Sequence, residues 1–112
     1  TTGAKWAIHE LGHIFESTVN GNLVGSSVRN ILGKDSSIDR RPDNGDGTYG
    51  FAGPRFGWQQ SGSGTTGEEF ADMFIGWVYN QWQTTGSGAA QGRARADFMS
   101  RNMPLWVDLT TN

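Results

Sequence analysis

The sequence contains no cysteine, which excludes disulfide bonds and thiolate ligands for a metal ion. No apolar run reaches the length of about 20 residues that a membrane-spanning helix requires, so we expect no membrane span. Histidine is nearly absent as well, because the chain of 112 residues has only two. A metal site in this chain would therefore have to combine histidine with carboxylates.

The charge distribution does not favour nucleic acid as a partner. The formal net charge is −2, and the nine lysines and arginines are scattered along the chain instead of forming a basic stripe. Three of these residues, Arg93, Arg95 and Arg101, are expected to form a solvated helix face.

The length predicts one domain covering residues 1–112, because a chain this short does not support two cores. Its 17 glycines predict long connections, and its five tryptophans predict a small aromatic core. The chain starts at Thr1 rather than at an initiator methionine, so additional segments upstream of Thr1 are expected. A Ser-, Thr-, Gly- and Asn-rich chain of this kind suits a secreted or cell-surface bacterial protein.

Apolar spacing predicts three helices, over residues 2–18, 65–82 and 89–102. Pro104 is expected to stop the third helix, since proline in a helix interior removes a backbone hydrogen bond. The residues expected to supply apolar contacts are Trp6, Ile8, Leu11, Ile14, Phe15, Phe70, Phe74, Trp77, Val78, Ala94, Phe98, Leu105 and Trp106.

Residues 20–64 are expected to be mostly irregular. The stretch NLVGSSVRNIL at 22–32 fits either a short helix or a strand. Two turn signals, Asn44-Gly45 and Asp46-Gly47, predict a short hairpin around residues 38–52. The acidic DNGDG at 43–47 suggests calcium, but glycines stand where an EF-hand loop needs ligands, which weakens this interpretation.

The stretch AIHELGHIF places His9 and His13 four residues apart, with Glu10 directly after the first histidine. On a helix these histidines share one face and can aim their imidazoles at a single Zn²⁺. This H-E-x-x-H pattern is typical of metallopeptidases, in which the glutamate acts as the general base. The alternative is a helix carrying two unrelated histidines. Gly12, inside the same helix, predicts close packing against backbone or against the metal site.

The third ligand is expected to be a carboxylate on the helix at 65–82. Glu68 is the preferred ligand and Glu69 the alternative, because a capping box at Thr66 would occupy Glu69. Asp72 lies four residues after Glu68 on the same face, so it can accept a hydrogen bond from a ligand histidine and fix its orientation.

HELGH followed by EEFAD resembles the gluzincin zinc metallopeptidases, with their H-E-x-x-H and E-x-x-x-D/E patterns. In scale the chain is similar to minigluzincins and to the catalytic domains of lethal-factor-like toxins. The resemblance covers two helices, about a third of the chain. It implies a zincin-like α+β fold, mainly helical, with an active-site helix, a glutamate helix and a C-terminal helix.

The resemblance also implies that Zn²⁺ is held by His9, His13 and Glu68, with Asp72 in support. Glu10 would activate the zinc-bound water for hydrolysis of a protein or peptide substrate. Such families often use Tyr or His to stabilise the oxyanion, and Tyr49 is the residue we assign here, with Arg55 and Tyr79 as the other candidates.

The chain departs from these families in having only eight residues before His9, where their β-sheet would lie. Its sheet is therefore expected to be small or missing, and the chain to be a fragment lacking an upstream sheet. This departure leaves a non-catalytic binding or structural module with a zincin-like frame as the main alternative. A regulatory fragment of a larger assembly is a further one.

Overall fold

A computed structural model describes residues 2–35, 66–82 and 89–111. These residues form four helices and no strand, which confirms a mainly helical chain. The helices are α1 (Thr2–Asn20), α2 (Val28–Lys34), α3 (Thr66–Tyr79) and α4 (Ala89–Thr111). The predicted hairpin at 38–52 and the DNGDG stretch lie outside the described residues.

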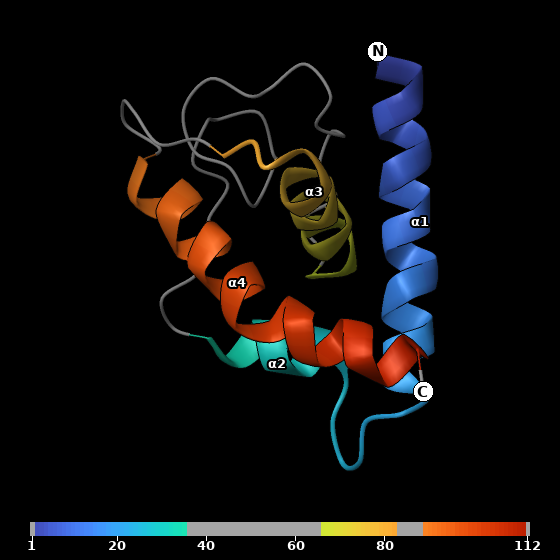
Figure 1. Cartoon of the computed structure of the whole chain (residues 1–112). Helices are drawn as coiled ribbons and strands as arrows, with labels where there is room; N and C mark the ends of the chain where they lie inside the picture. The colour runs from blue at the N-terminus through green and yellow to red at the C-terminus, as the bar shows by residue number, and fades with distance from the viewer. Residues whose placement is uncertain (1, 36–65, 83–88, 112) are drawn as a thin grey trace.

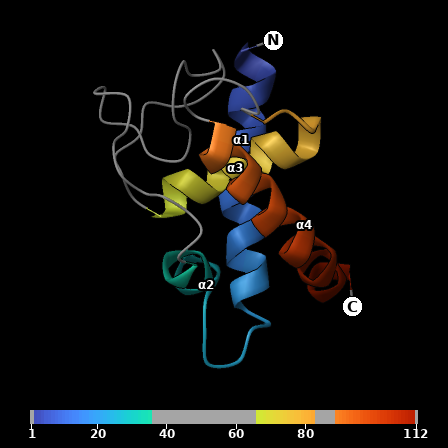
Figure 2. The ribbon, with the colours of Figure 1, turned by 90° about the vertical axis from the view of Figure 1, so that its left-hand side faces the viewer.

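α3 lies between α1 and the N-terminal part of α4, as Figures 1 and 2 show. α3 crosses the middle of α1, and α1 packs more extensively on α3 than on any other element. α4 packs on both α1 and α3, and its C-terminal end lies beside the C-terminal end of α1 (Figure 1). The crossing of α1 and α3 therefore fixes the relative positions of the two predicted motifs.

The core lies where all four helices meet and is built from aliphatic, aromatic and methionine side chains. The ring of Trp106 on α4 lies 6.0 Å from that of Phe70 and 5.9 Å from that of Phe98. The buried residues of this cluster are Val19, Val28, Leu32, Phe70, Met73, Phe98, Met99, Met103 and Trp106. This cluster confirms the predicted inward positions of Phe70, Phe98 and Trp106.

Several apolar residues expected to make core contacts are exposed instead. On α1 these are Trp6, Leu11 and Ile14. Val78 and Leu105 are also exposed. The described helices include none that is both long and apolar enough to cross a membrane.

Gly12 lies at the point of closest approach between α1 and α3. A Cβ atom there would lie 3.0 Å from the Cβ of Phe74 and 3.2 Å from the Cα of Ala71. Gly12 was predicted to pack against either backbone or the metal site, and it packs against the backbone of α3. Because Gly12 directly precedes His13, this close packing also brings that histidine next to α3.

α2 settles the ambiguous stretch at 22–32 as a short helix. The Ser27 side chain caps its start by accepting a hydrogen bond of 3.1 Å from the Asn30 N–H. The Asn20 side chain, at the end of α1, accepts a bond of 2.8 Å from the Val28 N–H. This bond ties the first residue of α2 to the last residue of α1.

α4 continues through Pro104 to Thr111, so the predicted end at residue 102 is wrong. Pro104 and Ser100, whose carbonyl loses its helical partner, are both exposed, so water can bind that carbonyl. Met103 and Trp106, on either side of the proline, are buried and hold the helix onto the core. The helix bends along its length (Figure 1), as an internal proline favours.

Candidate metal centre

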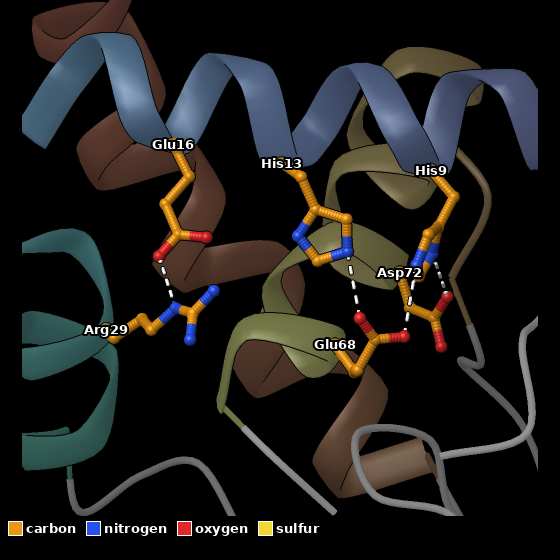
Figure 3. Close-up of polar contacts among 6 residues, drawn as sticks. All are labelled: His9, His13, Glu16, Arg29, Glu68 and Asp72. Carbon is orange, nitrogen blue, oxygen red and sulfur yellow. Dashed lines mark hydrogen bonds and ion pairs between the residues drawn. The ribbon is translucent and has the colours of Figure 1, made fainter. Parts of the chain in front are cut away.

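The three predicted ligands come together between α1 and α3, as Figure 3 shows. The Nε2 atom of His9 lies 3.2 Å from Oε2 of Glu68. The Nε2 atom of His13 lies 2.9 Å from Oε1 of the same carboxylate. One carboxylate from α3 thus faces both imidazoles from α1, although 59 residues separate His9 from Glu68.

Asp72 is placed as predicted, behind the first histidine. Its Oδ1 atom lies 2.9 Å from Nδ1 of His9, and both side chains are almost fully buried. Asp72 follows Glu68 by one helical turn, so one helix supplies a carboxylate to each nitrogen of the His9 ring. This contact fixes the ring orientation and leaves Nε2 directed at Glu68.

The pKa of His9 is raised above its ordinary value of 6.5 in the metal-free protein. Burial opposes this shift, because it disfavours the charged imidazolium. The hydrogen bond and negative charge of Asp72, together with those of Glu68, outweigh the cost of burial. With a carboxylate at each ring nitrogen, the doubly protonated ring can donate to both.

The metal-free protein should therefore lose stability as the pH rises. A group with a raised folded-state pKa stabilises the fold fully below its unfolded pKa, here about 6.5, and loses that contribution as pH rises through the folded pKa. Changing Asp72 to Asn removes a charge that raises the His9 pKa, so the loss should be smaller. Urea unfolding midpoints, measured in chelator between about pH 5.5 and 8.5 so that the range spans the unfolded pKa, test this.

The exposed Asp97→Asn change is the control, and its urea midpoint should vary with pH as in the wild-type protein. The same variation with pH in all three proteins would contradict the expectation.

His9, His13 and Glu68 could together hold a metal ion. Each offers one ligand atom, and these atoms all lie within 4.8 Å of one another. Two imidazole nitrogens and one carboxylate oxygen are a donor set that zinc accepts in proteins, so the chemistry of these residues fits a zinc ion.

The neighbouring glutamate, Glu69, points away from the histidines into the interior. Its Oε2 atom accepts bonds of 3.3 Å and 3.2 Å from Nε and Nη2 of Arg95 on α4. Both side chains are fully buried. The structure thus places Glu68, and not Glu69, at the histidines. It also corrects the prediction for Arg95, which is buried in an ion pair, whereas Arg93 and Arg101 are exposed as expected.

The predicted general base lies next to the cluster but outside it. Glu10 is exposed, and helical geometry places it about 100° around α1 from His9. Among the described residues it makes no hydrogen bond or ion pair, so its carboxylate is available to solvent. Tyr79, at the far end of α3 from Glu68, does not join the cluster. Tyr49 and Arg55 lie outside the described residues.

Two charged residues that were not predicted to belong to the site lie beside His13 (Figure 3). Glu16 follows His13 by three residues on the same face of α1, and its carboxylate is buried. Arg29 of α2 donates from Nε to Oε2 of Glu16 over 2.7 Å. The spacing from His13 to Glu16 was a signal for the glutamate, but no pattern in the sequence identified Arg29 as its partner.

The two helices thus bring the H-E-x-x-H residues and the downstream Glu68 and Asp72 into one site. Comparisons with models of protein families, with curated proteins and with solved structures found no match for this chain.

Proposed function

We propose that this chain is a zinc-dependent metallopeptidase that hydrolyses peptide bonds in a protein or peptide substrate. The observation that carries the proposal is the meeting of two imidazole Nε2 atoms from α1 with one carboxylate from α3. The glutamate directly after the first histidine adds a base next to this cluster. The resemblance to gluzincins supports the same interpretation.

Each side chain has a separate task in this proposal. His9, His13 and Glu68 would hold the zinc, which when bound supplies Lewis acidity towards a carbonyl oxygen and lowers the pKa of water. Asp72 accepts a hydrogen bond from the Nδ1–H group of His9, which leaves Nε2 as the ligand atom. Glu10 accepts a proton from the attacking water and donates it to the leaving amine.

The partial exposure of the cluster supports a catalytic role over a closed structural one. The side chains of His13 and Glu68 are 28% and 34% exposed, so a substrate can reach them from solvent. A structural zinc is normally enclosed by four protein ligands, and the described residues bring three together.

A non-catalytic module with a zinc site is the second candidate. It is favoured by the lack of any strand among residues 2–35, 66–82 and 89–111, because peptidases of this type bind extended substrates on a strand. The two candidates differ in hydrolysis and share the zinc site.

Zinc analysis and a peptidase assay on the purified chain test the proposal. We expect one bound zinc, no hydrolysis of unstructured peptides in chelator, and recovery on addition of zinc. Loss of a supporting residue costs about 10–100-fold in metal affinity, so Glu68→Gln should cost at least tenfold. The exposed Asp97→Asn change should leave zinc affinity unaltered. Zinc binding that is insensitive to Glu68→Gln would contradict the site, and zinc binding without any hydrolysis would favour the structural module.

A further inference from the structure

We propose that Arg29 is a substrate-binding residue whose guanidinium binds a carboxylate of the peptide next to the metal centre. This inference rests on the proposed function, because it assigns the substrate class of the same site. The carboxylate can be the C-terminus of the peptide or an acidic side chain. Three observations support it, namely how Arg29 is anchored, what it packs against and which of its donors remain available.

Arg29 is anchored next to the metal ligands by a buried carboxylate. Glu16, only 3% exposed, lies one helical turn beyond His13 and accepts the Arg29 Nε–H over 2.7 Å. The start of α2 is itself held by the bond between the Asn20 side chain and the Val28 N–H, one residue before Arg29. Both the backbone and the head of Arg29 are therefore held in place relative to α1.

The guanidinium also lies close to the backbone that leads into the third ligand. A Cβ atom at Gly67 would lie 2.5 Å from Cζ and Nη2 of Arg29 and 2.8 Å from its Nε. Only glycine leaves this space open, and Gly67 directly precedes Glu68. The Arg29 side chain thus extends from α2 towards the two helices that carry the cluster (Figure 3).

The outer edge of the guanidinium remains available for a ligand. Glu16 takes the Nε–H, and among the described residues Arg29 has no other hydrogen-bond or ion-pair partner. The side chain is 56% exposed, so solvent reaches it. Two parallel N–H groups on this edge match the two oxygens of a carboxylate.

Equilibrium binding of short peptides to the metal-free chain tests Arg29 without relying on catalysis. The probes are acetylated tetra-alanine with a free C-terminus, the same peptide with a C-terminal amide, and the amide with aspartate at its third position. Hydrogen bonds to charged groups contribute about 1.5 kcal/mol or more, so at least one carboxylate probe should bind about tenfold tighter than the neutral amide in an NMR titration. The carboxylate probe that shows the preference identifies the source of the carboxylate.

Variants separate recognition from folding. Arg29→Met should abolish the carboxylate preference, and Gly67→Ala should weaken it, because the new methyl group displaces the flexible guanidinium and not the backbone. Arg101→Met is the matched control: Arg101 is 59% exposed and also makes one ion pair to a carboxylate, that of Asp35, so the preference should persist. Zinc affinity should be unchanged in all three variants.

Equal affinity for carboxylate and amide probes in the wild-type chain would overturn the inference. A preference that survives Arg29→Met, or that Arg101→Met removes equally, would do the same. If the zinc-loaded chain hydrolyses peptides without any such preference, only the role of Arg29 is wrong. If the preference depends on Arg29 but no hydrolysis occurs, the peptidase proposal is wrong and carboxylate binding stands.

Discussion

Replacing Glu10 with glutamine is expected to lower the rate of peptide hydrolysis about a hundredfold to ten-thousandfold, the usual contribution of a positioned general base. Glutamine keeps the shape of the side chain but cannot accept the proton of the attacking water. Since Glu10 is exposed and lies outside the cluster of His9, His13 and Glu68, zinc affinity should stay within about twofold, far less than the 10–100-fold cost of losing a supporting residue. Measuring hydrolysis and zinc affinity on the same preparation separates these two effects.

The exposed Asp97 on α4 offers a matched control for this experiment. Asp97→Asn makes the same change from carboxylate to amide away from the cluster and should retain the wild-type rate. Full activity in the Glu10→Gln protein would contradict the assignment of Glu10 as the general base. Loss of zinc together with activity would instead show that Glu10 supports the metal site.

The second large effect is expected for Arg95, where a change to methionine should lower the free energy of unfolding by about 3–5 kcal/mol. Arg95 and Glu69 form an ion pair between α4 and α3, and both side chains are fully buried. Methionine has a similar length but leaves the Glu69 carboxylate in the interior without its cation. Because whole domains are stable by only about 5–15 kcal/mol, urea unfolding followed by circular dichroism will show a large shift.

A double variant separates a lost charge partner from lost packing. Buried ion pairs replaced entirely by apolar residues are often close to neutral, so Glu69→Leu with Arg95→Met should recover most of the lost stability. Arg101→Met removes an exposed pair with Asp35 and should cost less than about 1 kcal/mol. An Arg95→Met protein with the wild-type urea midpoint would refute the importance of the buried pair.

The ion pair also bears on the site itself. Glu69 follows Glu68 directly in the first turn of α3, so its attachment to Arg95 fixes the rotation of that turn. We therefore expect the orientation of Glu68 towards the histidines to depend on Arg95, although the two side chains lie on different faces of α3.

The long helices were predictable because their apolar residues recur at helical spacing and their ends carry clear signals. α1 ends at Asn20, where an Asn-Gly pair follows the last apolar residue. The prediction for α3 ran to residue 82, three residues beyond its observed end at Tyr79, after which Asn80 has a left-handed φ of 51°. α2 was ambiguous because seven residues show too little periodicity, although Ser27 was a usable capping signal. The end of α4 was misjudged because burial of Trp106 outweighs the local cost of Pro104.

The parts of the site that depend on residue spacing within a single helix were predictable. The spacing of His9 and His13 places both rings on one face, and the spacing of Glu68 and Asp72 does the same on α3. Whether Glu68 or Glu69 faces the histidines depends on how α3 crosses α1, which no local pattern encodes. Arg95 was misjudged, and Arg29 was not singled out, for the same reason, since their partners lie on other helices.

The cluster of His9, His13 and Glu68 joins α1 to α3, and zinc binding there would have a thermodynamic consequence. The ligand atoms converge only when the two helices are docked, so the ion binds the native chain in preference to the unfolded one. Linkage then adds about 2.7 kcal/mol to the native state when free zinc exceeds its dissociation constant a hundredfold. The population of folded molecules would thus vary with zinc supply. Zinc depletion would expose the chain to proteolysis, apart from any effect on catalysis.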